Sequence, residues 1–171
     1  QRAGSIISGV RALIKKAPAA FAPIEMNGLV KETLALLRSE LNVSEIEVIL
    51  DLADAPLHTQ GDRVQLQQVL LNLYVNAADA MKHEPSARQL TVVTRHASDG
   101  DVLVEVLDTG SGIDAASVKK LFDPFFTTKT KGLGMGLAIC REIIQLHHGQ
   151  MWARPNSPAG AVFYFSLPAQ A

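Results

Sequence analysis

The stretch NLYVNAADA, residues 72–80, carries two helical patterns at once and lies in a segment, 62–82, that predicts one long helix. One set of positions is apolar and recurs every three or four residues, as a buried helix face does. It comprises Leu66, Val69, Leu70, Leu73, Ala77, Ala80 and Met81. A second set is polar and stacks on another line, roughly a third of a turn away. It comprises Gln68, Asn72, Asn76 and Asp79. Since amide oxygens suit Mg²⁺, this second face is expected to line a polar pocket, although a solvated face fits the same pattern.

Working outward from this helix, the hydrophobic pattern predicts strands on both sides of it. They are expected at 22–26, 46–52, 90–96, 102–107, 150–154 and 161–167, with further helices at 27–41 and 136–148 and a short helical piece near 115–122. Residues 58–61 are ambiguous. Asn27 is expected to cap the first helix, 46–52 to be half-buried, and Gly149 to be left-handed after the last helix. Because strands and helices do not alternate regularly, we expect an α/β (α+β) two-layer sandwich, with a mixed five-stranded sheet and about three helices on one face.

The strand at 102–107 runs into DTGSG, residues 108–112, which places a carboxylate at the end of an apolar face. Side chains alternate along a strand, so Asp108 shares one side with the valines of that strand. A buried carboxylate needs a donor, and Gly110 and Gly112 keep the neighbouring space free of side chains. A flat ligand with an exocyclic amine, such as adenine, would satisfy both conditions. An Asp108 that only caps its own turn is the alternative.

Residues 131–137, KGLGMGL, alternate glycine with apolar residues directly before the last predicted helix. Backbone N–H groups at a helix start attract phosphate, glycines let it approach, and Lys129 and Lys131 add positive charge. The run lacks the Gly-Lys-Ser/Thr end of a Walker loop, and Leu137 stands where a dinucleotide fingerprint needs glycine. A loop without a ligand fits the same pattern.

Three phenylalanines lie between the two glycine clusters, at 122, 125 and 126. Aromatic side chains in a polar stretch are not expected to remain in water. They would either anchor a movable lid over a nucleotide or form ordinary core beneath a long loop.

The composition excludes several classes of protein. Of 171 residues, 47% are hydrophobic and 19% charged, with a net charge of −1, which leaves no basic field for nucleic acid or an anionic membrane. The single cysteine, Cys140, excludes an internal disulfide framework and a Cys-rich zinc site. No apolar run approaches the ~20 residues of a membrane span, and we expect no signal peptide. The chain is expected to be cut from something longer, with 1–16 a short N-terminal amphipathic helix and 17–23 a Pro-containing linker.

Four segments together resemble the sequence boxes of sensor histidine kinases. NLYVNAADA at 72–80 resembles the N box, DTGSGI at 108–113 the G1 box, FDPF at 122–125 the F box, and GLGMGL at 132–137 the G2 box. Order and spacing agree, and the resemblance covers about residues 24–168. Residues 2–16 are similar to the end of the second helix of a dimerisation and phosphoacceptor bundle. The Thr-Thr-Lys at 127–129 is similar to kinases of the nitrogen-regulation and oxygen-sensing type.

The resemblance implies the ATP-binding fold shared by histidine kinases, gyrase-type topoisomerases and Hsp90-type chaperones, with 24–171 as the catalytic domain. Asn76 would hold Mg²⁺ against the phosphates of ATP, Lys129 would be a cationic contact, and both would be catalytic. Asp108 would accept from the adenine amino group. The implied nucleotide contacts are Asn72, Asn76, Asp79, Ala80, Asp108, Gly110, Gly112, Ile113, Thr128, Lys129, Gly132, Leu133, Gly134, Met135, Gly136 and Leu137. The γ-phosphoryl group would pass to a histidine mainly by positioning and charge neutralisation.

The resemblance also implies partners: the upstream helical bundle and a response regulator protein. The parent protein would be a cytoplasmic homodimer that a membrane anchor could accompany, and neither nucleic acid nor membrane is expected for this fragment. No histidine lies in the context of the family's phosphate acceptor; those present are His58, His83, His96, His147 and His148. The chain is therefore expected to lack its own acceptor. His147 and His148 are interpreted as cations at a helix C-terminus.

Two further departures bear on function. Val162 stands where many relatives carry a threonine near the nucleotide, which removes one hydroxyl. Asn72 stands where ATP-hydrolysing relatives carry a glutamate, and an amide cannot take a proton from water. This argues against a fast ATP-hydrolysing conformational machine. A non-catalytic nucleotide-sensing or dimerisation module stays open as an alternative to the kinase.

Overall fold

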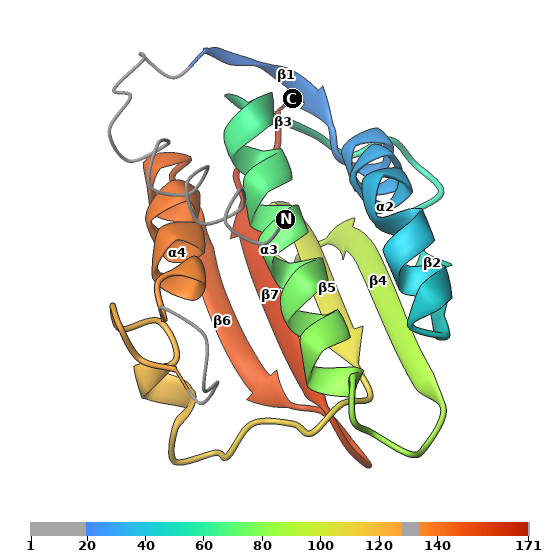
Figure 1. The fold of residues 1–171 in the computed structure, drawn as a ribbon. Coiled ribbons are helices and arrows are strands. Elements are labelled where there is room, and N and C mark those ends of the chain that lie inside the picture. Colours follow the sequence, from blue (N-terminus) through green and yellow to red (C-terminus); the bar gives the residue numbers. More distant parts are fainter. Residues whose placement is uncertain (1–19, 128–133, 171) are drawn as a thin grey trace.

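The computed structural model describes residues 20–127 and 134–170 of the chain, and in this part the fold has two layers. Helices α2, α3 and α4 cover one face of a five-stranded sheet with the order β2-β4-β5-β7-β6 (Figure 1). The elements are α2 (Met26–Val43), α3 (Arg63–Met81), α4 (Gly136–Leu146), β2 (Ile46–Asp51), β4 (Arg88–His96), β5 (Val102–Asp108), β6 (Gln150–Pro155) and β7 (Ala161–Leu167). β2 runs parallel to β4, and the other neighbouring strands are antiparallel. The predicted sandwich with a mixed sheet is confirmed.

A separate two-stranded ribbon closes the end of the molecule at which the described chain begins. β1 (Phe21–Glu25) pairs antiparallel with β3 (His58–Asp62), and Phe21 lies opposite Asp62. The ambiguous residues 58–61 are therefore a strand, and residues 21–23 of the expected linker belong to this ribbon.

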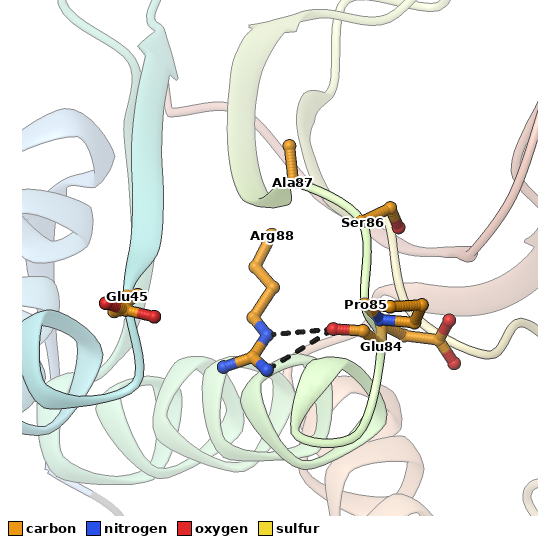
Figure 2. A pocket seen from close by; sticks show the side chains of 6 residues that line it. All are labelled: Glu45, Glu84, Pro85, Ser86, Ala87 and Arg88. Atoms are coloured by element: carbon orange, nitrogen blue, oxygen red, sulfur yellow. Dashed lines mark hydrogen bonds between the residues drawn. The ribbon is translucent and has the colours of Figure 1, made fainter.

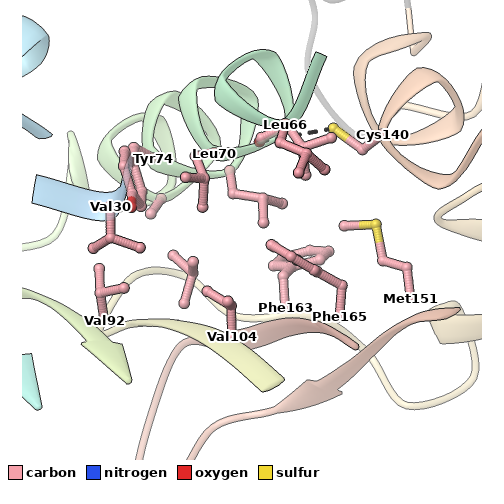
Figure 3. Packing of buried hydrophobic residues seen from close by; sticks show 14 of the residues in the cluster. Val30, Leu66, Leu70, Tyr74, Val92, Val104, Cys140, Met151, Phe163 and Phe165 are labelled. Atoms are coloured by element: carbon pink, nitrogen blue, oxygen red, sulfur yellow. Dashed lines mark hydrogen bonds between the residues drawn. The ribbon is translucent and has the colours of Figure 1, made fainter. Parts of the chain in front are cut away.

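The core lies between α3 and the sheet. Alternation along β5 turns Val104 and Val106 inward, opposite Phe165 and Phe163 of β7, and α3 packs its apolar stripe above them (Figure 3). Burying this many aliphatic and aromatic side chains is the main stabilising contribution to the fold. Within the described residues, no helix is both long and apolar enough to cross a bilayer.

The expected cap of α2 is wrong by two residues. Glu25, in an extended conformation, accepts hydrogen bonds from the N–H groups of Asn27 and Gly28 at 3.0 and 2.6 Å. Asn27 lies inside the helix, where its amide donates to the Ala53 carbonyl at 3.0 Å and accepts from the Thr94 hydroxyl at 2.6 Å. Asn is a preferred N-cap residue and Glu is not, so the local preference pointed to Asn27; its hydrogen bonds to two distant segments place it inside the helix instead.

β2 was expected to be half-buried, but it is an edge strand and largely exposed. Only Ile46 is buried in it, whereas Val48 and Leu50 are 37% and 43% exposed. These side chains border a groove of about 430 Å³ between β2 and α2. Alternation in sequence does not distinguish a central strand from an edge strand, because both can face a helix on one side.

Arg88 joins the end of α2 to the segment after α3, and Figure 2 shows its hydrogen bonds to Glu84. Its guanidinium donates to the Glu84 carbonyl just after α3 at 3.3 Å and to the Ser44 carbonyl at the end of α2 at 2.9 Å. It lines a cleft of about 280 Å³, which none of the predicted nucleotide contacts lines. The arrangement satisfies carbonyls that a helix C-terminus leaves without partners.

The end of α4 corrects two predictions. His148 (φ 61°), not Gly149, takes the left-handed conformation. Gly149 is required for a different reason, since a Cβ there would lie 2.1 Å from the Ser166 carbonyl oxygen. His147 is buried, and its Nε2 accepts from the Asp62 backbone N–H at 2.9 Å, so its ring is neutral and not the expected cation.

Candidate functional site

The long helix α3 supplies one wall of the candidate site. Asp62 begins it by accepting from the N–H groups of Val64 and Gln65 at 2.9 and 3.1 Å. The predicted apolar stripe is buried except for Ala80, which is only partly buried, and Tyr74, which was not predicted, is fully buried. The polar positions Gln68, Asn72 and Asn76 are partly buried, and Asp79 is exposed. The second face is thus neither core nor open surface along most of its length.

Asn72 faces the neighbouring helix α4. Its Nδ2 donates to the Cys140 sulfur at 3.5 Å, and that sulfur lies 3.9 Å from the Val69 carbonyl. Burial raises the pKa of the Cys140 thiol to about 12, so the thiol keeps its proton at neutral pH. This contact ties α4, which begins where the glycine loop ends, to the polar face of α3.

Asp108 lies where the period of β5 predicted it, on the apolar face and only 3% exposed. The N–H groups of Gly110 and Ala161 donate to its Oδ1 at 2.9 and 3.3 Å. Burial raises its pKa above the ordinary value of 3.8, and these two hydrogen bonds oppose the rise. Asp108 therefore does cap its own turn. Within the described residues both donors use Oδ1, which leaves Oδ2 as the oxygen for a ligand.

The glycine turn after Asp108 lies against the end of α3. A Cβ on Gly110 would come within 2.7 Å of the Ala80 backbone, and the Ser111 N–H donates to the Ala80 carbonyl at 3.1 Å. Only a residue without a side chain lets the turn approach this closely. The carboxylate at the end of β5 and the polar helix are thus held side by side, as the predicted site requires.

Sequence reasoning missed a second loop that shapes this turn. A Cβ on Gly160 (φ 97°) would lie 1.9 Å from the Asp108 carbonyl oxygen, and the Asn156 side chain donates to the same oxygen at 2.9 Å. A glycine just before β7 was the only signal available, and many turns contain one.

The strand register corrects the prediction for Val162. Val162 pairs with Leu107, whereas Phe163 pairs with Val106. Because alternate residues share a face, Ala161 lies on the face of Asp108 and Val162 on the opposite face. Ala161, not Val162, is the β7 residue beside the carboxylate, and its N–H binds it.

The remaining predicted contacts fall into two groups. Ile113 and Leu137 are partly buried against the core, and Gly134 (φ 65°) and Met135 lead directly into α4 at Gly136. A Cβ on Gly134 would lie 2.6 Å from the Phe125 carbonyl carbon, so the described end of the glycine loop lies on the phenylalanine segment. Thr128, Lys129, Lys131, Gly132 and Leu133 lie outside the described residues.

The three phenylalanines differ in how far they are buried. Phe122 is buried, with the Arg141 guanidinium 5.6 Å above its ring, and Phe126 is partly buried. Phe125 has φ 66° and is 73% exposed, so the prediction that all three leave water is wrong for it. In place of the short helix expected at 115–122 there is one 3₁₀ turn, Val118–Lys120.

Comparison with known proteins identifies the class. Residues 61–171 match the family model described as histidine kinase-, DNA gyrase B-, and HSP90-like ATPase. The chain therefore belongs to this family of ATPases, and the resemblance found in the sequence is confirmed.

Within this family, the similar proteins are sensor kinases. The sensor protein FixL of Bradyrhizobium diazoefficiens is 39% identical over 168 residues, 98% of this chain and 33% of that protein. The signal transduction histidine-protein kinase AtoS of Escherichia coli K12 is 38% identical over 85% of this chain and 23% of its own. The chain thus spans about a third or less of these relatives, and they support a protein-histidine kinase catalytic domain.

Solved structures of histidine kinases agree with this family assignment. The catalytic domain of the histidine kinase ThkA superposes with a TM-score of 0.78 at 33% identity, covering 87% of this chain and 95% of that domain. ThkA in complex with the response regulator protein TrrA gives a TM-score of 0.81 at 28% identity, covering 99% of this chain and 48% of that one.

Proposed function

We propose that this chain binds Mg·ATP and transfers the γ-phosphoryl group to a histidine of an upstream helical bundle. The observation that carries the proposal is Asp108: a buried carboxylate at the end of β5, held through one oxygen and next to a turn that touches α3. The fold is shared with histidine kinase catalytic domains, which supports a nucleotide site, and on this proposal the base would bind at Asp108. The proposed positions of the metal ion and the phosphates follow from this position of the base.

The adenine ring would bind in front of Asp108. Its exocyclic amine would donate to Oδ2, since Oδ1 already accepts two backbone hydrogen bonds. Gly110 and Gly112 let the turn pack against Ala80 and Gly160, which holds Asp108 in place, and Ala80 and Ile113 would border the ring. A hydrogen bond to a buried carboxylate discriminates strongly, because a ligand without the donor leaves the charge unpaired.

The polar face of α3 suits Mg²⁺ better than a softer metal. It offers side-chain amide oxygens from Asn72 and Asn76, with Asp79 one turn further on, and no His, Cys, Asp or Glu cluster that could hold a metal occurs among the described residues. Asn76 would hold the ion and the phosphates would complete its shell. Bound there, Mg²⁺ would neutralise phosphate charge.

The phosphates would lie at the start of α4. Its N-cap residue, Met135, makes no side-chain capping bond, so backbone N–H groups of Gly136 and Leu137 suit a phosphate oxygen. Thr128, Lys129, Gly132 and Leu133 would also contribute to this site, with Lys129 as the cation beside the phosphates.

Transfer needs little covalent chemistry from this chain. Its residues orient the nucleotide, exclude water from the base and balance charge, and the attacking histidine comes from elsewhere. Asn72 donates to Cys140 and has no basic group to activate water, which supports slow hydrolysis. We assign residues 1–16 to the end of the upstream dimerisation and phosphoacceptor helix, 17–20 to a linker and the rest of the chain, from the first residue of β1, to the catalytic domain. The parent protein would be a cytoplasmic homodimer that addresses a response regulator.

Phosphotransfer in trans tests the proposal. The chain is mixed with labelled ATP, Mg²⁺ and a separately made acceptor bundle of a related kinase, and the acid-labile phosphohistidine is measured. We expect label on the bundle histidine and none on this chain. Tight ATP binding without transfer to any acceptor bundle would instead favour the nucleotide-sensing module.

Substituting the predicted metal ligand tests the magnesium assignment. Asn76→Ala is expected to remove most of the Mg²⁺-dependent part of ATP affinity, at least about tenfold, because it removes the amide oxygen that would hold the ion, while the Asn72 amide is bonded to Cys140. Titration calorimetry with and without Mg²⁺ measures it, and Asn42→Ala on the exposed part of α2 is the control. An unchanged Mg·ATP affinity would count against the assignment.

A further inference from the structure

The C-terminal end of α4 is fastened to the ribbon β1–β3 through one buried histidine. His147 is 2% exposed, its Nε2 accepts from the Asp62 N–H at 2.9 Å, and its Nδ1 lies 2.8 Å from the Ile143 carbonyl oxygen. Because a backbone N–H can only donate, Nε2 is unprotonated and Nδ1 carries the proton to Ile143. The two ring nitrogens therefore make different contacts: Nδ1 donates to a carbonyl of the last turn of α4, and Nε2 accepts from a residue outside that helix.

The surroundings of this ring are closely fitted. Phe21 of β1 stacks on it with the ring centres 4.7 Å apart, and a Cβ on Gly61 of β3 would lie 2.8 Å from its Cδ2. Asp62, whose N–H the ring binds, is also the residue that caps α3. One imidazole thus joins the end of α4 to the beginning of α3.

A second polar contact between α3 and α4 provides a point about which α4 would rotate if its C-terminal end were displaced. Asn72 meets Cys140 near the middle of α4. At ~1.5 Å per residue, His147 lies ~10 Å beyond that contact and Gly136 ~6 Å before it. A shift of about 1 Å at His147 would then move Gly136 by about 0.6 Å, similar to the ~0.5 Å tolerance of a functional site.

We propose that His147 is a positioning residue: through Nε2 it fixes the angle of α4 on α3 and thereby places the end of the glycine loop against the polar face of α3. The inference rests on the proposed function for its consequence in nucleotide binding. The link itself is a property of the nucleotide-free protein and is tested separately.

Two variants separate the roles of the two ring nitrogens. His147→Gln puts an oxygen where Nε2 was, the same number of bonds from Cβ, and keeps the acceptor for Asp62. His147→Asn keeps a donor near Nδ1 for Ile143 but cannot reach Asp62. Both lose the stack with Phe21. If His147 serves only to bind the Ile143 carbonyl at the end of α4, Asn should preserve the packing of α4 better than Gln. If His147 positions α4 through Asp62, Gln should preserve it better than Asn.

Cys140 reports on the link without any nucleotide. It is the one cysteine in the chain and lies on the buried side of α4, facing α3, so alkylation of the native protein by iodoacetamide requires α4 to open. We expect His147→Gln to react about two- to threefold faster than the wild type, because it loses the stack, and His147→Asn to react about a further 5- to 10-fold faster, as loss of one buried hydrogen bond implies. His148→Asn, at an exposed left-handed position that Asn tolerates, should leave the rate unchanged.

The contribution of global unfolding, which is the unfolded fraction from urea denaturation multiplied by the alkylation rate of the unfolded chain, is subtracted from each rate, so that only opening of α4 is counted. Should neither His147 variant fold, Phe21→Leu removes the stack alone and should raise the rate about two- to threefold. Equal corrected rates for the two His147 variants, or an unchanged rate in Phe21→Leu, would overturn the proposal. Mg·ADP affinity is measured on the same proteins: we expect His147→Asn to bind more weakly than His147→Gln. Absence of binding in the wild type would sink the proposed function and leave the alkylation result standing.

Discussion

At the scale of single residues, the proposed function makes Asp108 the residue that selects adenine. Asp108→Asn replaces the charged acceptor for the adenine amine and is expected to weaken ATP and ADP binding about 10- to 100-fold, while inorganic triphosphate binds as before. Titration calorimetry compares the ligands, with the exposed Asp54→Asn as control. An equal loss for ATP and triphosphate would remove the adenine assignment.

The same carboxyl predicts a pH dependence of stability. Burial raises its folded-state pKa above 3.8, so the folded protein holds the proton more tightly than the unfolded chain. Its stabilising contribution is full at low pH and is lost as pH rises through the raised pKa. The free energy of unfolding of Asp108→Asn minus that of the wild type should therefore increase from about pH 3 through that pKa and then level off. Urea unfolding at a series of pH values measures it; a decrease over this range would contradict the burial argument.

Tyr74 poses a different question about a buried polar group. It is fully buried in α3, and its hydroxyl has no hydrogen-bond partner among the described residues. Removing an unpaired buried hydroxyl is neutral or favourable, so Tyr74→Phe is expected to keep or raise the free energy of unfolding by up to about 1 kcal/mol. Urea denaturation compares it with Tyr164→Phe on the outer face of β7. A loss above about 1 kcal/mol would mean that the hydroxyl is paired.

At the scale of elements, substitutions at two glycines distinguish the cost of backbone strain from the cost of a close contact. Gly160 (φ 97°) and Gly100 (φ 92°) have similar conformations, but a Cβ on Gly160 would lie 1.9 Å from the Asp108 carbonyl and one on Gly100 would meet nothing within 4 Å. Gly100→Ala should cost about 1 kcal/mol of stability, and Gly160→Ala at least about 2 kcal/mol more. Thermal and urea unfolding give the difference. Equal losses would show that the loop at 156–160 does not support the Asp108 turn.

Elements were predictable from sequence where one strong period governs them. The 3.6-residue period gave α3 almost to its ends, and the two-residue period put Asp108 on the buried face. Caps and helix ends were not predictable, because several residue types can fill them. Glu25 caps α2 where Asn27 stands nearby, and His148 is left-handed where Gly149 follows. The choice depends on distant partners: Thr94 for Asn27 and Ser166 for Gly149.

The sequence patterns identified the segments of the candidate site, but they did not identify the contacts between those segments. Asn72 and Asp108 were identified from their patterns, whereas Gly160, Asn156 and His147 act through neighbours more than 45 residues away in sequence. A charge rule for helix ends suggested a cationic His147; the N–H of Asp62 makes it a neutral acceptor instead. Such pairings arise from topology and leave no local signal.

At the scale of the whole molecule, we propose that three distant segments surround one nucleotide: 72–80 of α3, the turn at 108–113, and the start of α4 at 134–137. The two clefts described, beside Arg88 and between α2 and β2, involve none of them. The arrangement is a property of the sheet order, which brings the end of β5 beneath the end of α3 and sets α4 beside it (Figure 1).

Amide hydrogen exchange of the full chain, with and without a Mg²⁺ complex of a non-hydrolysable ATP analogue, tests this claim most directly. We predict that the analogue slows exchange in all three segments together and leaves the α2–β2 groove unchanged. Protection confined to one segment, or centred on that groove, would contradict the account.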